Sequence, residues 1–442
     1  MPQIELVTPN DNFPDRADAV IIGAGIAGIS TALELADRGL RVVVVEKGEV
    51  ACEQSSRNWG WCRQMGRDPR EVPLIQVALA KWRTMNARMG AETGFRQCGI
   101  VYLSQTDAEL AKHEKWWRDV AKPNKLGTRM LSSKEAAKLV PGCLKPWAGG
   151  LHTADDGRAE PFIAVAAMAR ALQAKGGQVF TQCAARGIET TAGKVSALVT
   201  EKGVIKTDTV VVAGGYWTRR FLGNLGIDFP QVGAINSVMR TGPRDAGIAH
   251  TFSGSKYTVR KRLDGGFTIT HQHLSVADIT PAQIRQYFRF RPLMQLDAKG
   301  LRVRLTGRFL QEAFMRRHWR LDQVSPFERL RVLDPKPVHG ILDEAFAALQ
   351  QDFPAFQGLQ SVERWAGMID ATPDVVPVID GLAKMPGLFV ASGFSGHGFG
   401  LGPGAGQLLA EIMTGEKPCV DPAPFRFARF RESPRSRPST GL

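Results

Sequence analysis

Three glycines and one acidic residue near the start of the chain have the spacing of a dinucleotide-binding turn. Gly23, Gly25 and Gly28 follow a short apolar run, and Glu46 ends the next apolar run. Glycines at these positions allow a tight turn, let a pyrophosphate approach the backbone, and let the following helix pack closely. The helix N-terminus then faces the phosphates, and Glu46 accepts a hydrogen bond from a ribose hydroxyl. We therefore predict a dinucleotide site at this turn.

Two further segments combine small polar side chains with glycine. The segment 53–60, EQSSRNWG, carries hydroxyl groups that can wrap a pyrophosphate or a flavin ribityl chain, although alone it is an ordinary polar loop. The segment 387–404 is an apolar run that leads into a dense glycine cluster and then a helix. Such a segment builds a second place where backbone amides meet a ligand, which NAD-dependent dehydrogenases do not need.

The residues around these motifs predict alternating strands and helices. Residues 19–45 have the pattern of a parallel strand–helix–strand unit. The turn 264–266, Asp-Gly-Gly, predicts a hairpin between 257–262 and 267–270. Apolar spacing predicts further helices at 72–89, 103–117, 132–139, 161–175 and 407–413, and further strands at 179–181, 195–200, 209–212 and 388–391.

The composition indicates a soluble globular enzyme and excludes general disorder. The chain has 442 residues, 43% of them hydrophobic, and its 57 basic and 43 acidic residues give a net charge of +14. Positive charge concentrates in a predicted basic helical block, 277–331, and in a basic tail, 426–442. Both fit either a solvated face or an anionic partner, such as a membrane surface or another subunit. No nucleic-acid-binding motif is present, so we expect no nucleic-acid partner.

The sequence also bears on location and redox state. No stretch is long and apolar enough for a membrane-spanning helix, and the N-terminal residues lack a signal-peptide pattern, so we expect a cytoplasmic protein. The six cysteines contain no C-x-x-C pair and are interpreted as reduced thiols.

Together these motifs make the chain resemble the glycine/D-amino-acid oxidase family, the FAD-dependent amine oxidoreductases that include D-amino-acid oxidase and sarcosine oxidase. The likeness runs from about 19 to 430 and rests on the glycine turn with Glu46 and on segments 55–60, 156–161, 210–217, 372–374 and 393–400. It implies an α/β fold in which a Rossmann-like FAD-binding domain is assembled from three chain segments and carries an inserted antiparallel-sheet substrate domain. The expected boundaries are 17–95, 148–222 and 360–425 for the FAD domain, and 96–147 and 223–359 for the substrate domain.

The resemblance also implies which residues lie along FAD. Ala184 or Ala185 offers its backbone to the adenine, and the residues from Gly393 to Phe399 follow the isoalloxazine ring. The full expected set is Gly23, Gly25, Ile26, Ala27, Gly28, Glu46, Lys47, Ser55, Ser56, Arg57, Asn58, Gly60, Trp61, Ala184, Ala185, Ala213, Gly214, Trp217, Gly393, Ser395, Gly396, His397, Gly398 and Phe399.

The reaction implied is oxidation of the carbon–nitrogen bond of an amino acid, or of a secondary or N-substituted amine that bears a carboxylate, by hydride transfer to flavin N5. Oxygen or a quinone would accept the electrons. The carboxylate needs a bidentate cation, for which Arg63 and Arg260 are the candidates. His271 and His397 are the candidate catalytic side chains, and Trp365 is a candidate wall of the substrate pocket.

Alternatives remain open from the residues alone. Arg63 and Arg260 also fit ordinary surface cations, His397 fits a loop histidine satisfied by backbone, and His271 with His273 forms a metal-type pair that lacks a third ligand. Other functions on this scaffold are an FAD-dependent 2-hydroxy-acid dehydrogenase, with His271 or His397 as base, and a non-catalytic flavin-bearing binding subunit.

Two departures from the sarcosine oxidases concern the cofactor and the substrate. Gly367 stands where those enzymes carry the cysteine that is linked to flavin, and Gly400 stands where they carry a lysine after the GHGF motif. The first departure predicts that FAD is bound without a covalent link.

Overall fold

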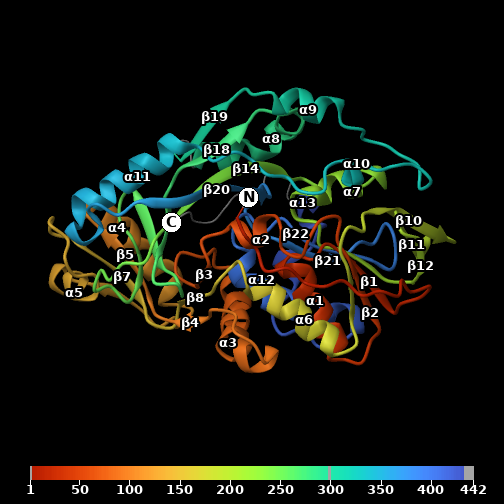
Figure 1. The fold of residues 1–442 in the computed structure, drawn as a ribbon, viewed down its shortest axis with the longest axis horizontal. Coiled ribbons are helices and arrows are strands. Elements are labelled where there is room, and N and C mark those ends of the chain that lie inside the picture. The colour runs from red at the N-terminus through yellow and green to blue at the C-terminus, as the bar shows by residue number, and fades with distance from the viewer. Residues whose placement is uncertain (1, 297–299, 433–442) are drawn as a thin grey trace.

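A mostly parallel six-stranded sheet forms one half of the molecule in the computed structural model, which describes residues 2–296 and 300–432 (Figure 1). Its strand order is β21-β22-β13-β1-β2-β9, and only β21 runs antiparallel to its neighbour. The strands are β1 (Ala19–Ile22), β2 (Val42–Val45), β9 (Gln178–Phe180), β13 (Val210–Val212), β21 (Val378–Gly381) and β22 (Leu388–Ser392). Their unbroken apolar runs are typical of parallel strands covered on both faces.

Helices cover one face of this sheet and a small sheet covers the other. The helices are α1 (Ile26–Ala36), α3 (Val72–Met89), α6 (Ala164–Ala174) and α12 (Gly398–Thr414), and they share one core with alternate strand residues. The opposite face packs against the three-stranded sheet of β10 (Ala185–Thr191), β11 (Lys194–Thr200) and β12 (Val204–Lys206). The strand–helix–strand unit predicted over 19–45 is confirmed in this arrangement.

Helix α12 begins inside the glycine cluster, whereas the sequence predicted a loop through Gly406 and a helix from 407 to 413. The glycines serve packing. A Cβ on Gly402 would lie 2.5 Å from Ile26 Cγ1, and one on Gly406 would lie 2.5 Å from the carbonyl carbon of Ser30, both on α1. A Cβ on Gly404 would lie 2.7 Å from the carbonyl oxygen of Leu74 on α3. The glycines thus let α12 lie very close to α1 and α3, and this packing outweighs their low helix propensity.

A large, mostly antiparallel sheet forms the other half of the molecule. Its order is β19-β18-β14-β17-β16-β15-β5-β7-β6, and β20 also pairs with β14. The predicted hairpin is confirmed as β16 with β17. The strands are β5 (Ile100–Ser104), β6 (Thr128–Leu131), β7 (Gly149–Thr153), β14 (Val232–Thr241), β15 (Thr251–Ser253), β16 (Tyr257–Lys261), β17 (Phe267–His271), β18 (Ser275–Asp278), β19 (Leu301–Arg304) and β20 (Ser361–Ala371).

Strand pairing differs from the predicted segment boundaries at two points. The expected FAD-domain segments 148–222 and 360–425 include β7 and β20, but both strands pair within the large sheet. Strand β20 therefore runs out of the large sheet directly toward β21 and β22, so it connects the two halves. Residues 103–117, predicted as one helix, instead end β5 and then form α4 (Asp107–Trp116), whose N-terminus is capped by Thr106 and Glu109.

The remaining elements are short or peripheral. A small three-stranded sheet consists of β3 (Trp61–Cys62), β8 (Gly157–Arg158) and β4 (Arg96–Gln97), with β8 in the middle. The other helices are α2 (Gln54–Arg57), α5 (Ser133–Leu139), α7 (Thr218–Asn224), α8 (Pro281–Leu296), α9 (Arg308–Phe314), α10 (Pro326–Arg329), α11 (His339–Asp352) and α13 (Arg429–Glu432). Single-turn 3₁₀ segments lie at Gly215–Trp217, Pro354–Phe356 and Ala423–Phe425, and a π-helical turn lies at Trp117–Ala121.

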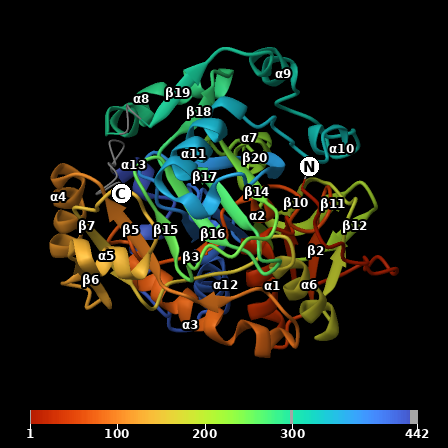
Figure 2. The same cartoon turned by 60° about the vertical axis from the view of Figure 1, so that its left-hand side comes forward.

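The predicted basic helical block consists of several short helices and strands separated by loops. It contains the end of β18, then α8, β19, α9 and α10, and Figures 1 and 2 both place α8 and α9 at the periphery, far from α3. Its last part returns to the six-stranded half, where Trp319 Nε1 donates to the carbonyl oxygen of Arg186 at 2.7 Å. Arg331 is ion-paired with Glu201 at 2.6 Å.

The basic tail is partly anchored. Arg429 is buried, and its guanidinium contacts both oxygens of the fully buried Asp374 at 3.0 and 3.2 Å. Residues 433–442 of the predicted tail lie outside the described residues. Within the described residues, no helix is long and apolar enough to cross a membrane.

Candidate cofactor and substrate site

The nucleotide turn between β1 and α1 depends on backbone contacts that only glycine permits. Gly23 has a φ of +104°, and a Cβ there would lie 2.5 Å from the carbonyl oxygen of Ala213. A Cβ on Gly28 would lie 2.0 Å from the carbonyl oxygen of Gly23. Gly25 is the N-cap of α1, and the next amide, Ile26 N, donates to Ser55 Oγ at 2.9 Å. The turn therefore has the tight geometry that the spacing predicted.

Glu46 follows β2 and braces this turn. Its Oε2 accepts from Ala24 N at 2.9 Å, and its Oε1 accepts from Gly48 N at 2.8 Å. Burial raises the pKa of the carboxyl group, while Lys47 and these two amides oppose that rise. Each carboxylate oxygen has capacity for a further hydrogen bond, so the side chain remains able to accept from a ribose.

A large cavity begins at this turn and runs between the two halves of the molecule. Its empty volume, including the open mouth, is about 1170 Å³. Of the residues expected along FAD, those that line it are Gly23, Gly25, Ile26, Ala27, Glu46, Lys47, Ser55, Asn58, Ala185, Ala213, Gly214, Trp217, Gly396, Gly398 and Phe399. The expected residues outside the lining are Gly28, Ser56, Arg57, Gly60, Trp61, Ala184, Gly393, Ser395 and His397.

The lining includes residues that the sequence did not single out. Phe327, from the end of the basic block, closes one side of the cavity. Glu53 accepts from Trp217 Nε1 at 3.0 Å and from Lys47 Nζ at 2.5 Å, so it joins the predicted polar loop to two expected cofactor residues. The position of Glu53 within the segment EQSSRNWG could have indicated that it lies at the cofactor cavity. No residue pattern around Phe327 indicates that it lines the cavity.

Asp370 is a buried carboxylate on the floor of the cavity that sequence reasoning missed. Its Oδ2 accepts from Gly393 N at 2.8 Å and from Gln231 Nε2 at 3.3 Å. Gln231 Nε2 also donates to the carbonyl oxygen of Gly215 at 3.0 Å. Burial raises the pKa of Asp370 to about 6. Asp370 thus contacts the turn after β22 directly, through Gly393, and the turn after β13 indirectly, through Gln231.

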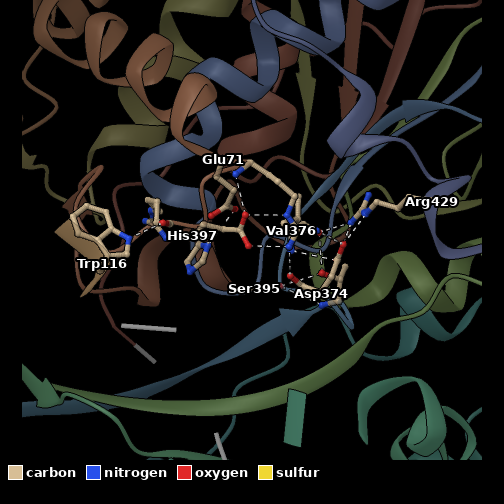
Figure 3. Close-up of polar contacts among 11 residues, drawn as sticks. Glu71, Trp116, Asp374, Val376, Ser395, His397 and Arg429 are labelled. Carbon is tan, nitrogen blue, oxygen red and sulfur yellow. Dashed lines mark hydrogen bonds and ion pairs between the residues drawn. The ribbon is translucent and has the colours of Figure 1, made fainter. Parts of the chain in front are cut away.

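The N-termini of α3 and α12 meet beside the cavity through Glu71 and His397. Figure 3 shows the two side chains facing each other, with Ser395 on the adjoining turn. His397 Nδ1 lies 2.9 and 3.2 Å from the two oxygens of Glu71, which is fully buried. Burial and the nearby Arg67 lower the pKa of His397, although Glu71 acts in the opposite direction. His397 is therefore fixed by a carboxylate and not by backbone.

Arg63 is the expected substrate-binding residue whose positive charge has no ion pair with a carboxylate of the described residues. It follows β3, donates to the carbonyl oxygen of Met65, and lies over the rings of Trp61 and Tyr102 at 5.8 and 5.6 Å. Within residues 2–296 and 300–432, no carboxylate lies within 4 Å of its guanidinium nitrogens. The side chain is thus placed to receive an anion.

Arg260 does not fit its predicted role. Its guanidinium is buried and already makes a two-pronged contact with Glu160, at 2.8 and 3.2 Å, while Thr268 Oγ1 accepts a further bond at 3.0 Å. Arg57, expected along FAD, likewise turns away and is ion-paired with Asp334 at 2.5 Å. Glu160 thus occupies the fork of Arg260, whereas Asp334 contacts Arg57 only through Nη1 and leaves Arg57 Nη2 without a partner in the described residues. Spacing along the sequence cannot reveal such contacts.

The other expected substrate residues lie on the large sheet. Trp365 is buried, and its Nε1 donates to the carbonyl oxygen of Arg57 at 3.2 Å. His271 is buried at the end of β17, where burial lowers its pKa to about 4, and its Nδ1 accepts from His273 N at 3.3 Å. Among the described residues no cluster of three or more potential ligands could hold a metal ion.

Comparison with known proteins decides the family. The model of the family described as FAD dependent oxidoreductase matches residues 18–412. The chain belongs to this family.

Solved structures and characterised sequences agree. The structure is similar to L-amino acid deaminase from Proteus myxofaciens, with a TM-score of 0.93 and 33% identity over 97% of this chain and 96% of the other. It is similarly close to L-amino acid deaminase from Proteus vulgaris, with a TM-score of 0.92 and 33% identity over 96% of this chain and all of the other. In sequence it is 25% identical to glycine oxidase from Pseudomonas aeruginosa over 92% of this chain and 97% of that protein.

This member of the FAD-dependent oxidoreductase family has a cavity that fits its cofactor. Two buried acceptor atoms in the lining, Gln54 Oε1 and Thr218 Oγ1, have no hydrogen-bond partner within the described chain. Unpartnered buried polar atoms are costly, and a dinucleotide supplies polar groups to meet them. The residues present therefore suit FAD.

The environment of Gly367 explains why no side chain is present there in this family member. A Cβ on Gly367 would lie 2.2 Å from Gln54 Oε1 and 3.1 Å from Arg57 Cβ. Gln54 thus occupies the space that a cysteine would need. Loop 53–60 and strand β20 are packed against each other at this point.

Proposed function

We propose that this FAD-dependent oxidoreductase oxidises the carbon–nitrogen bond of an amino acid, or of an N-substituted amine, that carries a carboxylate. The observation that carries the proposal is Arg63, a guanidinium without a carboxylate partner beside the N-terminus of α12. When bound, FAD would supply the hydride acceptor for this reaction. The names of the similar proteins, L-amino acid deaminase and glycine oxidase, support an amino-acid substrate.

The chain's own residues bind and orient the substrate in this scheme. Arg63 holds the carboxylate through two parallel hydrogen bonds, a geometry that lysine cannot reproduce. The N-terminus of α12 provides positive dipole at the cofactor end of the cavity, where negative charge develops. Trp61 and Tyr102, against which Arg63 lies, exclude water from its charge. Because a neutral amine can lose hydride directly, no protein base is required.

A 2-hydroxy-acid substrate is the alternative on this scaffold, because the hydroxyl proton must then go to a base. His397, whose pKa is lowered by burial and by Arg67 and whose Nδ1 contacts Glu71, is the candidate base for this proton. Its Nδ1 contact is also compatible with a purely positioning role, so substrate tests must separate the two readings.

The experiment is anaerobic bleaching of the flavin absorbance with matched pairs. Alanine against lactate, in both configurations, separates amine from hydroxyl oxidation, and N-methyl and N-carboxyalkyl amino acids extend the panel. Bleaching by amines alone is expected. Bleaching by lactate with none by any amine would replace the proposal with the alternative. Reoxidation of the bleached enzyme by air or by a soluble quinone then identifies the electron acceptor.

We also propose that FAD is held without a covalent link. Gly367 supports this, because it supplies no thiol at the position where the sarcosine oxidases carry the linking cysteine. Acid precipitation should release all yellow colour into the supernatant. Colour retained in the washed precipitate would contradict the proposal.

The periphery of the basic block supports contact with an anionic membrane surface. Many of the large exposed apolar side chains of the described residues gather there, namely Ile284, Tyr287, Phe288, Leu296, Val303, Leu305, Leu310 and Phe314. Arg289, Arg302 and Arg304 lie among them with 43, 54 and 41% of their side-chain surface exposed. We define these residues as the α8–α9 surface. Apolar groups mixed with arginine suit the interface of an anionic bilayer.

Co-sedimentation with anionic and neutral liposomes tests this contact. Changing Phe288 and Phe314 to Ser should abolish binding to anionic liposomes, whereas changing Leu144, an exposed apolar residue outside the α8–α9 surface, should not. Dimerisation of the parent that is lost in the double variant, without liposome binding, would assign the surface to a second subunit. If the parent and all variants sediment equally with liposomes and have the same oligomeric state, the α8–α9 surface is a solvated face.

A further inference from the structure

Arg67 differs from every other buried arginine in the described part of the chain. The others each contact a carboxylate: Arg57 with Asp334, Arg260 with Glu160, Arg262 with Asp264, and Arg429 with Asp374. Arg67 is 3% exposed, and no ion pair joins it to a carboxylate of residues 2–296 or 300–432. Its Nε donates to the carbonyl oxygen of Arg63 at 3.2 Å, but its buried Nη1 has no acceptor.

A buried guanidinium that contacts no carboxylate is costly, because a single backbone acceptor replaces little of the hydration that its charge has lost. The carboxylates nearby do not compensate for this loss. Glu71 and Asp156 favour the charged form of Arg67 from a distance, yet burial and the neighbouring Arg63 outweigh them and lower its pKa to about 10. Glu71 is already engaged with His397 Nδ1.

The place of Arg67 relates this feature to the proposed reaction centre. Its charge lowers the pKa of His397, which is the N-cap of α12, and Trp116 Nε1 holds its backbone carbonyl at 3.0 Å. Strand β3, which precedes Arg63, lies against α12 so closely that a Cβ on Gly400 would be 3.2 Å from the carbonyl oxygen of Trp61. Arg63 and Arg67 therefore lie together next to the start of α12, just outside the residues that line the cavity.

A second buried donor on this segment also has no acceptor. Trp61 Nε1 is unpartnered, and Arg63 lies over the same indole ring. Single unpartnered donors also occur elsewhere, at Arg57 Nη2 and Arg260 Nε, but those two guanidinium groups each contact a carboxylate. At Arg67 an unpartnered donor coincides with an uncompensated charge, which points to a ligand rich in acceptor oxygens. One carboxylate suffices for Arg63 alone, but it leaves Arg67 without a contact.

We propose that the substrate carries two carboxylates, one bound by Arg63 and the second by Arg67. The substrate class is then an acidic amino acid or an N-carboxyalkyl amino acid. This inference rests on the proposed function, because it assigns the substrate of that same site. Arg67 is a specificity-determining residue in this arrangement, since its fork offers two donors to the second carboxylate.

Matched substrate pairs test the inference on the holoenzyme. Aspartate is compared with asparagine, glutamate with glutamine, each in both configurations, and iminodiacetate with N-methylglycine. For at least one pair, kcat/KM for flavin reduction should be about ten-fold or more higher with the dicarboxylate, as expected for a charge-assisted hydrogen bond. Equal or higher kcat/KM with the monocarboxylate of every pair would overturn the inference and leave the proposed function intact.

The variant Arg67→Met should remove this preference. The kcat/KM of the dicarboxylate is expected to fall about ten-fold or more, while that of the monocarboxylate changes less than three-fold. Arg83→Met is the control, because Arg83 lies on α3 with 40% of its side chain exposed and no carboxylate of the described residues closer than 4.0 Å. An equal fall for both substrates in Arg67→Met would show a structural role and contradict the inference.

Calorimetric binding provides a readout that does not depend on turnover. Succinate should bind the parent enzyme about ten-fold or more tightly than butyrate, and Arg67→Met should abolish the difference. If Arg67→Met does not fold, the conservative Arg67→Lys replaces it, with an expected partial loss of the same ratio. Equal affinity of the parent for succinate and butyrate would refute the second carboxylate site. If no amine bleaches the flavin but succinate still binds selectively, the proposed function fails and the anion site at Arg67 stands.

Discussion

Two glycine turns of the cofactor cavity are each held by a carboxylate, the partly buried Glu46 and the buried Asp370, and the two carboxylates belong to different parts of the fold. Glu46 holds the nucleotide turn from the next strand of the same parallel sheet. Asp370 holds the turn at Gly393 from β20, a strand of the large sheet. The carboxylate that braces the nucleotide turn thus comes from within one strand–helix–strand unit, whereas the one that braces the flavin end comes from the other half of the molecule.

The largest expected effect comes from filling the nucleotide turn. Gly28→Ala would place a Cβ 2.0 Å from the carbonyl oxygen of Gly23, and backbone cannot yield to it without moving the turn. Overpacking of this kind typically costs about 1–3 kcal/mol, and here it also displaces the phosphate-binding amides. We expect a lowered Tm and purification without bound flavin. Gly340→Ala, on α11 with nothing within 4 Å of the added atom, is the control and should keep both.

A smaller effect separates the two carboxylates. Glu46→Ala should weaken FAD binding about ten-fold or more, because a charged hydrogen bond contributes about 1.5–3 kcal/mol. Asp370→Ala should weaken it less, since the contacts of Asp370 are to the protein itself. Dissociation constants for FAD measured by fluorescence titration of the apoproteins decide this order. Wild-type affinity in Glu46→Ala would refute a ribose contact.

The smallest expected effect is a difference in pH dependence. The pKa of Asp370 is raised from 3.8 to about 6, so the folded protein holds this proton where the unfolded chain has released it. Stability therefore falls as pH rises from about 4 to about 6. Between pH 5 and 7 the loss at this site is about 1 kcal/mol. Asp370→Asn, which keeps an acceptor but cannot ionise, should show a shallower decline of Tm over that range. Parallel declines in both proteins would contradict the shift.

Features that depend on nearby residues could be predicted from the sequence, whereas features that depend on distant segments could not. The turn from Gly23 to Gly28 with Glu46 was predicted because its residues contact one another within one strand–helix–strand unit. Asp370 and Phe327 were not predicted, because their partners lie far away in the chain. The high glycine content led to a wrong prediction for the start of α12. Close packing of α12 against α1 and α3 requires glycines, although local propensity assigns glycine-rich segments to loops.

Charge pairing was the least predictable feature. Arg260 and Arg67 are both arginines near aromatic residues, and sequence reasoning selected the first for substrate binding. The structure places Glu160 against Arg260 and, among the described residues, places no carboxylate against Arg67. Which arginine is compensated depends on contacts between distant segments, so the type and spacing of these residues carry no information about it.

The central position of β1 has a consequence for the order in which the protein is made. Strand β1 pairs with β2 and with β13, and β13 in turn pairs with β22, whose residues begin at Leu388. A ribosome therefore releases the nucleotide turn several hundred residues before the strand and helix that complete the cavity. The nascent chain must keep the exposed edge of β13 unpaired through this interval, a state that favours aggregation. Free FAD in the cell cannot stabilise the chain until synthesis has passed α12.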